Sequence, residues 1–292
     1  MGTDVHLIVG GAGAGDLVER AERRISDLER RWSRFRPDSE VSRLNAGDPM
    51  TISDETFELV DRAVTGWRMT GGAFDPTVLD AVTSLGYDRD FGSLGGSVAG
   101  SRPSRPARGC NGTVLSRAAR LVKLPDGARI DPGGIGKGLA ADMVSSETMR
   151  AGARGCCVDI GGDLRVAGSA PGAGAWGVDV EDPLAGRGTI GCIRLRRGAA
   201  TTSWRTKRTW AAADGERHHL VDPSTGESIR SGVASVTAVT GLAWKGEVLC
   251  KAAFVAGPAE GVALLERNGA AGLLVDDGGR VHRAGPIEDF LS

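Results

Sequence analysis

A lysine stands among glycines at the junction Asp131-Pro132-Gly133-Gly134-Ile135-Gly136-Lys137-Gly138. We expect a strand before this junction and a helix after it. Backbone N–H groups, the positive end of the helix and the Lys137 ammonium would then face one anion. The glycine spacing differs from that of a Walker loop, and no serine or threonine follows the lysine. Taken alone, the junction predicts a phosphate site or, equally well, a structural turn.

Two aspartates lie on other glycine-rich turns. Asp75 belongs to Gly71-Gly72-Ala73-Phe74-Asp75-Pro76-Thr77, directly after the expected end of a helix, and Pro76 stiffens the turn that presents it. Asp163 follows Gly161-Gly162 at the end of an expected strand. A carboxylate on such a turn can accept a hydrogen bond from a ligand or take up a proton. Taken singly, each is better explained as an Asx-turn or capping residue.

Half of the four histidines stand together in His218-His219-Leu220-Val221-Asp222-Pro223-Ser224-Thr225-Gly226. An isolated histidine pair more often makes structural hydrogen bonds than it binds a metal. Adjacent side chains of a strand face opposite ways, so only one can face a given pocket. We expect that one to be His219.

Hydrophobic periodicity and turn residues predict the elements that position these groups. Helices are expected over 17–32, with Asp16 as N-cap, and over 54–70, 137–149, 244–256 and 258–268; strands are expected over 5–9, 121–124, 155–160, 176–180 and 233–239. The mixed order indicates an α+β fold with mixed sheets and packed helices. The early Gly11, Gly13 and Gly15 give G-x-G-x-G, which favours a turn over a dinucleotide-binding loop.

Bulk composition excludes several classes of function. The chain has 292 residues, 40% of them hydrophobic, which fits a single domain over 1–292 or two packed lobes, with a Gly/Ser/Pro/Arg-rich surface loop at 92–112. Lys plus Arg is 36 and Asp plus Glu is 37, so no net field favours nucleic acid or an anionic membrane. Five cysteines without zinc-site spacing are expected to be free thiols. With neither a secretory signal nor a bilayer-spanning segment in this sequence, we expect a cytoplasmic protein.

Several motifs together resemble one family. In order they are the MGT start, Asp38-Ser39-Glu40-Val41-Ser42-Arg43-Leu44-Asn45, GGAFDPT, DPGGIGKG, VDIGGD, HHLVDPSTG and the late helix. Over nearly the whole chain this series is similar to the FAD:protein FMN transferase (ApbE) family, in particular to a short, signal-less branch of actinobacterial type.

The resemblance implies an ApbE-like, T-fold-related architecture and an enzyme that cleaves FAD. The FMN half would be attached to a Thr or Ser hydroxyl of an acceptor protein, and AMP would be released. Two alternatives stay open. One is an FAD pyrophosphatase that frees FMN and AMP, and the other is a non-catalytic FAD-binding or carrier protein.

The resemblance also implies site residues. Positions that match FAD contacts of the family are Met1, Trp32, Ser33, Arg34, Ala73, Phe74, Asp75, Asp131, Lys137 and Val221. His219 or Asp75 is expected to accept the hydroxyl proton, and Lys137 and Lys251 to stabilise the diphosphate.

The family's metal ligands match the Gly134 carbonyl and, on the late helix, Glu247 and Lys251, where the family has Asp and Thr. The resemblance implies Mg²⁺ as the metal cofactor. A glutamate can hold this ion, but a lysine ammonium has no lone pair to offer. Lys251 therefore either replaces part of the metal's charge beside the diphosphate or forms an ordinary i,i+4 helix pair with Glu247.

Overall fold

A computed structural model describes residues 2–47, 49–94, 97–98, 104–172, 174–184, 188–212 and 215–292. The chain divides into two compact units, each assembled from segments that are distant in sequence. The first unit comprises Met1–Gly2, Glu29–Gly134 and Arg205–Ser231. The second comprises Thr3–Leu28, Ile135–Trp204 and Gly232–Ser292. Met1, an expected FAD contact, lies outside the described residues.

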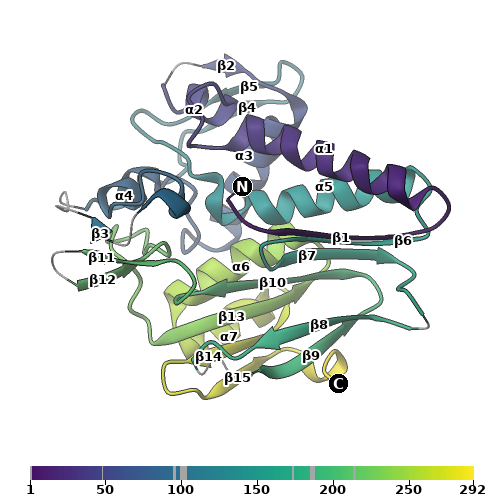
Figure 1. The fold of residues 1–292 in the computed structure, drawn as a ribbon. Coiled ribbons are helices and arrows are strands. Elements are labelled where there is room, and N and C mark those ends of the chain that lie inside the picture. The colour runs from purple at the N-terminus through teal and green to yellow at the C-terminus, as the bar shows by residue number, and fades with distance from the viewer. Residues whose placement is uncertain are drawn as a thin grey trace. The chain divides into compact units, whose positions relative to one another are not determined.

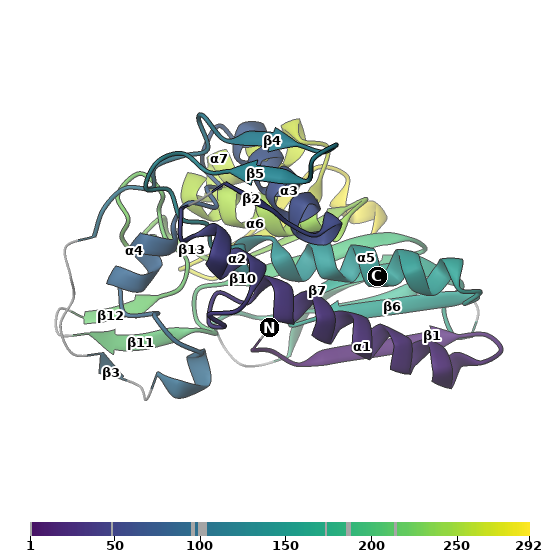
Figure 2. The same cartoon turned by 90° about the horizontal axis from the view of Figure 1, so that it is seen from above.

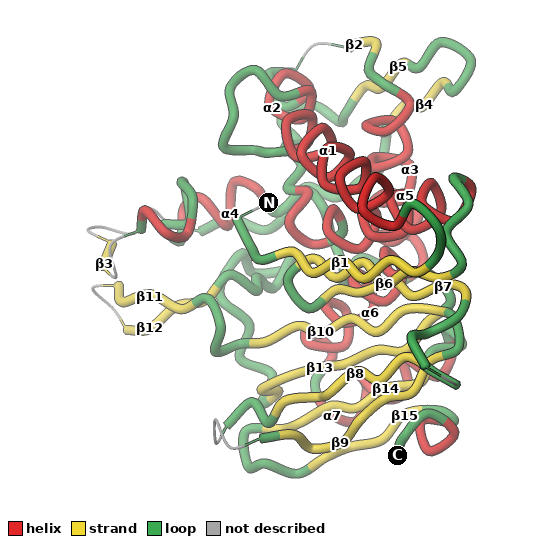
Figure 3. The backbone as a smooth tube through the Cα atoms, turned by 45° about the vertical axis from the view of Figure 1, so that its right-hand side comes forward, coloured by secondary structure: helices red, strands yellow, loops and turns green. Residues whose placement is uncertain are grey.

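A seven-stranded sheet forms the centre of the second unit, and its neighbouring strands are all antiparallel. Figure 3 shows these strands side by side. In spatial order they are β1 (Val5–Gly10), β6 (Gly155–Ile160), β7 (Asp163–Gly168), β10 (Gly198–Trp204), β13 (Val233–Thr240), β14 (Ala271–Asp276) and β15 (Val281–Ala284).

Helices cover one face of this sheet, as Figure 1 shows. They are α5 (Gly136–Arg150), α6 (Ala243–Ala256) and α7 (Pro258–Arg267). Helix α1 (Ala14–Trp32) begins in this unit and runs alongside α5 (Figure 2), where Arg24 pairs with Glu147 at 3.0 Å. The sheet face toward α6 is marked by Thr201 on β10, which contacts the buried Cys250.

The opposite face of the sheet packs against a hairpin of β8 (Trp176–Glu181) and β9 (Thr189–Leu195). Because side chains alternate along a strand, Leu164 and Ala200 point toward the hairpin while their neighbours Asp163 and Thr201 point toward the helices. The short helix η3 (Ile287–Asp289) contributes Ile287 to the same core. The sheet is thus buried on both faces.

The first unit contains shorter elements. They are α2 (Glu40–Leu44), β2 (Met50–Thr51), α3 (Asp54–Met69), α4 (Leu79–Ser84), η1 (Phe91–Ser93), β3 (Ser97–Val98), β4 (Val114–Ser116), β5 (Leu121–Lys123), η2 (Pro132–Gly134), β11 (Thr209–Ala212) and β12 (Gly215–His218). Two small sheets run in the orders β2-β5-β4 and β12-β11-β3, and β3 pairs with β11 in parallel. A core cluster joins α4 to β11, with Tyr87 and Trp210 among its buried members.

Every expected helix and strand is present, with ends within three residues of those predicted, and the α+β class is confirmed. The glycine-rich segment after β1 forms a turn, as expected, and not the loop of a dinucleotide-binding unit, because β1 pairs antiparallel with β6. The N-cap assigned to Asp16 is wrong. Helix α1 begins at Ala14, where the Gly13 carbonyl accepts the Leu17 N–H at 3.2 Å, and Asp16 lies in the first turn beside the positive helix end.

Two further expectations need correction. No strand leads directly into the Asp131 junction, because β5 ends at Lys123 and the chain turns before η2. His219 is not in a strand either, since β12 ends at His218. Over the stretches that the structure describes, no helix combines the length and apolar character needed to cross a membrane.

Candidate active site

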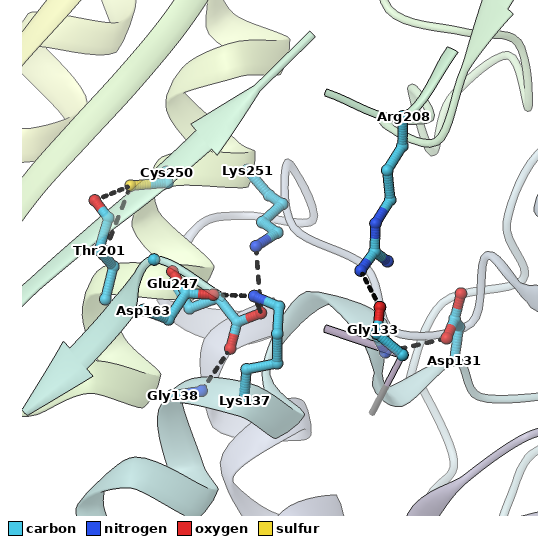
Figure 4. A network of polar contacts seen from close by, with 12 residues as sticks. Asp131, Gly133, Lys137, Gly138, Asp163, Thr201, Arg208, Glu247, Cys250 and Lys251 are labelled. Atoms are coloured by element: carbon cyan, nitrogen blue, oxygen red, sulfur yellow. Dashed lines mark hydrogen bonds and ion pairs between the residues drawn. The ribbon is translucent and has the colours of Figure 1, made fainter. Parts of the chain in front are cut away.

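Four charged side chains of the second unit form a single cluster (Figure 4). Lys137, the second residue of α5, contacts Asp163, the first residue of β7. The Lys137 Nζ also donates to Glu247 Oε1 of α6 at 3.0 Å. One turn further along α6, Lys251 Nζ donates to the same oxygen at 3.2 Å. We call Lys137, Asp163, Glu247 and Lys251 the lysine–carboxylate cluster.

Glu247 is the centre of the cluster and is completely buried. Its second oxygen, Oε2, accepts the Gly138 backbone N–H at 2.8 Å. Burial by itself would raise the pKa of Glu247, but the charges of Lys137 and Lys251 and the Gly138 hydrogen bond outweigh it and hold that pKa below 4.5. Glu247 is therefore an anion at neutral pH, with both carboxylate oxygens engaged.

The negative groups of the cluster are more deeply buried than its positive groups. The side chains of Asp163 and Glu247 are 0% exposed, whereas those of Lys137 and Lys251 are 17% and 16% exposed. The carboxylates therefore anchor the ammonium groups from beneath, and the positive ends reach toward solvent. Asp163 Oδ1 is buried and has no hydrogen-bond partner among the described residues.

A close approach of α5 and α6 brings the cluster together. A Cβ at Gly138 would lie 2.6 Å from the carbonyl carbon and oxygen of Ala243, so only glycine fits at this point. The approach allows the first turn of α5 to donate its Gly138 N–H to Glu247. The glycines of the junction thus serve helix packing as well as the turn.

Asp142 of α5 caps the beginning of α6. Its two carboxylate oxygens accept the Ala243 and Trp244 N–H groups, each at 3.0 Å, and Arg165 lies 3.4 Å from Oδ1. Burial raises the pKa of Asp142 to about 6, even though these hydrogen bonds and the arginine act to lower it. The cap fixes the end of the helix that carries Glu247 and Lys251.

The cluster does not fit a magnesium ion. Mg²⁺ needs several oxygen ligands in near-octahedral geometry, but Glu247 already accepts two ammonium groups and an amide. The Lys251 position offers an ammonium in place of an oxygen. Within the described ranges, no three His, Cys, Asp or Glu side chains are grouped so as to hold a metal. The expected carbonyl ligand, Gly134, belongs to the first unit, where it is half-buried in η2.

A second charged group lies in the first unit, around Arg34. Its guanidinium is 3.4 Å from Asp131, and its carbon lies 4.2 Å from the ring centroid of Phe35 and 4.6 Å from that of Tyr87. Arg208 donates to the Tyr87 hydroxyl at 3.1 Å and to the Gly2 carbonyl at 3.1 Å. We call Arg34, Phe35, Tyr87, Asp131 and Arg208 the arginine–aromatic group.

This group includes an unused donor. Arg34 Nη2 is buried without a hydrogen-bond partner in the described part of the chain, and so is the indole N–H of Trp32. Buried donors without protein partners are uncommon in native proteins, and each can donate to a bound ligand or an ordered water. Both residues were expected FAD contacts. Ser33 between them is half-buried, with its backbone N–H on the Glu29 carbonyl.

Asp75 is held rigidly in the same unit. Its Oδ1 accepts the backbone N–H and the hydroxyl of Thr77, each at 2.7 Å, and the Thr77 hydroxyl in turn accepts the Gly109 N–H at 2.9 Å. Burial raises the pKa of Asp75, although hydrogen bonds from Thr77 and Trp67 act to lower it. The Asx-turn geometry and the buried, more basic carboxylate are therefore both present.

The remaining expected residues have varied surroundings. Phe74 is buried and its N–H donates to Thr70, whereas Ala73 is half-buried. Val221 packs in the core cluster of Tyr87 and Trp210.

The two histidines differ in their surroundings. His218 is buried with Nε2 3.0 Å from the Ile229 carbonyl, and burial lowers its pKa. His219 is half-buried beyond the end of β12, and its backbone N–H donates to the Arg208 carbonyl at 3.3 Å.

The structure thus brings Lys137, Glu247 and Lys251 together in one unit, and Arg34 and Asp131 together in the other. Asp163 was noted as a turn carboxylate but not assigned to the site, and it proves to be a member of the cluster. Sequence reasoning missed Asp142, Arg208 and Tyr87 altogether. The only available signal was that Tyr87 is the single tyrosine of the chain.

Fold and cluster together define a class: an α+β protein with two partly exposed ammonium groups, held by buried carboxylates, at a glycine-rich helix start. Comparisons with known proteins agree with this class. The sequence profile of the ApbE family matches residues 1–274, and this chain therefore belongs to the ApbE family. The resemblance inferred from the motifs is thereby confirmed.

Individual relatives cover nearly the whole chain. An FAD:protein FMN transferase of Vibrio cholerae is 25% identical over 294 positions, covering 94% of this chain and 85% of that protein. One of Treponema pallidum is 28% identical and covers 87% of this chain and 75% of that protein. The crystal structure of an ApbE protein from Thermotoga maritima superimposes with a TM-score of 0.87 at 27% identity, over 99% of this chain and 96% of that one. The flavin transferase ApbE from Vibrio cholerae gives 0.82 at 25% identity, over 100% and 96%.

Proposed function

We propose that this chain is an FAD:protein FMN transferase, which moves FMN from FAD to a Thr or Ser hydroxyl of an acceptor protein. The observation that carries the proposal is the lysine–carboxylate cluster, whose outward ammonium groups suit a diphosphate, in a chain whose relatives are named for this activity. A cytoplasmic location is part of the same proposal. The five free cysteines support it, because structural disulfides are rare in that compartment.

The chemistry is a phosphoryl-type transfer. The acceptor hydroxyl oxygen attacks the FMN-side phosphorus of FAD and forms a phosphodiester bond. The bond from that phosphorus to the bridging oxygen breaks, and AMP leaves with this oxygen. The hydroxyl proton passes to a base on the protein. Catalysis of this kind depends mainly on positioning and on neutralising charge.

Named side chains can supply each part. Lys137 and Lys251 would neutralise the diphosphate, since their ammonium groups are held in place and partly exposed. Trp32 and Arg34 have buried donors available for FAD. Asp75 or His219 would accept the hydroxyl proton, and the raised pKa of Asp75 makes its carboxylate a better base than an ordinary aspartate.

The direct test is incubation of the protein with FAD and acceptor proteins carrying exposed Thr and Ser residues, followed by intact-mass measurement and AMP detection. We expect the acceptor to gain the mass of one FMN phosphodiester and AMP to appear in equal amount. FMN and AMP without an acceptor adduct would indicate a pyrophosphatase.

A carrier protein is the second candidate function, and one observation favours it: the cluster lacks a set of metal ligands. It predicts that FAD binds and remains intact for hours. Bound, intact FAD with every acceptor would replace the transferase proposal with this one.

A further inference from the structure

We propose that Lys251, together with Lys137, takes the place of a divalent metal ion in this chain, so that the diphosphate of FAD meets two ammonium groups and no metal. This inference rests on the proposed function for the identity of its ligand. The position of the ammonium groups and the hydrogen bonds that engage the Glu247 carboxylate carry it.

Both carboxylate oxygens of Glu247 already accept hydrogen bonds from the chain. Oε1 accepts Lys137 at 3.0 Å and Lys251 at 3.2 Å, and Oε2 accepts the Gly138 N–H at 2.8 Å. A metal at Oε1 would have to displace an ammonium group, and a metal at Oε2 would have to share that oxygen with the Gly138 N–H. Displacing the Gly138 N–H would also leave an unsatisfied amide at the buried crossing of α5 and α6. The carboxylate is therefore committed to cations that belong to the chain itself.

The positive charges of the cluster lie nearer to solvent than its negative charges. Glu247 and Asp163 are fully buried, while the ammonium ends of Lys137 and Lys251 are partly exposed. The cluster is close to neutral in sum, but an anion that approaches from solvent meets positive charge first. A divalent cation approaching by the same route meets repulsion. This arrangement selects phosphate over metal.

Lys251 has N–H donors beyond the one that Glu247 accepts. An ammonium carries more than one N–H, and Glu247 accepts one of them, so Lys251 can hold its carboxylate and a phosphate oxygen at the same time. A simple surface i,i+4 pair would have an exposed carboxylate, whereas Glu247 is 0% exposed. The pair is therefore part of a built site, not of a solvated helix face.

The test compares wild type with Lys251→Thr, which removes one of the two ammonium groups that donate to Glu247 Oε1. Lys245→Thr is the matched control, because Lys245 lies on the same helix but donates to the Asn268 carbonyl, outside the cluster. Magnesium binding without FAD is measured by calorimetry. FAD affinity is measured by fluorescence in EDTA and in magnesium. Circular dichroism and thermal melting establish that each variant is folded, and Lys251→Gln replaces Lys251→Thr if the latter is not.

We expect no magnesium binding by wild type or Lys245→Thr, and less than about a twofold effect of magnesium on their FAD affinity. In EDTA, Lys251→Thr should bind FAD about tenfold or more weakly than wild type, with affinity recovered in magnesium. The Gln substitute, which offers a carbonyl oxygen but a longer side chain, should show the same loss in EDTA. We expect magnesium to restore FAD affinity in Lys251→Thr and not in Lys251→Gln.

The inference would be overturned by magnesium binding of wild type at the same site, by a tenfold dependence of wild-type FAD affinity on magnesium, or by unchanged FAD affinity in Lys251→Thr. Failure to bind FAD under either condition would overturn it as well. The binding measurements need no acceptor. Metal-independent FAD binding without any AMP release would therefore defeat the transferase proposal and leave this inference intact.

Discussion

Lys137 and Lys251 donate to the same carboxylate oxygen, Glu247 Oε1, at 3.0 and 3.2 Å. One lysine comes from the start of α5 and the other from the middle of α6, so a single buried oxygen sets the spacing of two positive charges. Because the Gly138 N–H holds the other oxygen, the carboxylate cannot rotate without losing a hydrogen bond. The geometry of the ammonium pair is therefore fixed before a ligand arrives.

Glu247→Gln should destabilise the protein by about 3 kcal/mol at pH 7, because it leaves two cations around a neutral buried group. The folded-state pKa of Glu247 is depressed, so its contribution is present above about pH 4.5 and is lost as pH falls below that value. Urea unfolding from pH 7 to pH 3.5 should show that the difference in unfolding free energy between wild type and variant becomes smaller in acid. The exposed Glu260→Gln on α7 is the control and should cost less than about 1 kcal/mol. A difference in unfolding free energy that stays constant with pH would contradict the depressed pKa of Glu247.

Gly138→Ala should lower stability by about 1–3 kcal/mol, since the new Cβ would meet the Ala243 backbone at 2.6 Å and push α5 away from α6. Gly15→Ala in α1 is the matched control, because its Cβ would meet nothing within 4 Å. It should be neutral or stabilise by up to about 1 kcal/mol through helix propensity. Thermal melting of the two variants separates a general glycine effect from the crossing. Equal melting temperatures would show that the crossing tolerates a methyl group.

For Asp142 we expect a contribution to stability that depends on pH with the opposite sign. Its folded-state pKa is raised to about 6 from 3.8, so the folded state binds the proton more tightly than the unfolded chain. The contribution of Asp142 to stability should therefore fall as pH rises from about 4 to about 6, by roughly 3 kcal/mol if the full shift applies. Unfolding free energies of wild type and Asp142→Asn across this range give the difference directly. A difference that grows with pH would show that the Arg165 pairing outweighs burial.

Arg34→Lys should weaken FAD binding about tenfold, because a lysine keeps the charge but loses the planar contact with Phe35 and Tyr87 and the unused Nη2 donor. Arg36→Lys is the control, since Arg36 makes an exposed pair with Asp38 two residues away. Fluorescence titration with FAD measures both. If the two variants bind FAD alike, the arginine–aromatic group has no part in FAD recognition.

Asp75→Asn should slow AMP release by about 10²–10⁴-fold if Asp75 is the proton acceptor, and His219→Gln should then have a much smaller effect. Thr77→Val tests the assignment further. Hydrogen bonds from Thr77 lower the pKa of Asp75, so removal of the hydroxyl should raise it and shift the acid limb of the rate profile to higher pH. A collapse of rate in His219→Gln alone would assign the role to the histidine instead.

The sequence predicted the long elements because turn residues bound each of them and helix- or strand-forming residues fill each run. α3, α5, α6 and α7 each have an unambiguous run of helical residues, and β6 and β13 are apolar runs bounded by turns. It did not predict that β8 and β9 form a separate layer, since the partner of a strand is decided by tertiary packing. The start of α1 was misplaced because aspartate is favoured both as an N-cap and in a first helical turn.

The site was predictable where a motif names its residue and not where the fold alone selects it. Lys137, Glu247 and Lys251 followed from family motifs, and their contacts agree with one site. Asp163 was visible as a turn carboxylate, but only the antiparallel register of β7 with β10 places it on the helix-covered face. Asp142 carried no signal, because its partners are backbone amides more than 100 positions away.

The separation of 110 positions between Lys137 and Glu247 has a consequence for synthesis. While the chain is still growing, Lys137 and Asp163 emerge long before the helix that carries Glu247 and Lys251. Strand β10 likewise emerges before β13, with which it pairs. Long-range contacts of this kind form late in folding. A chain released before residue 247 would lack the anchor of its anion site as well as β14 and β15, the last two strands in the order of its sheet. The charged anchor of the anion site is therefore made after five strands of the seven-stranded sheet and before its last two, so the cluster can assemble only on a sheet whose central strands have already been synthesised.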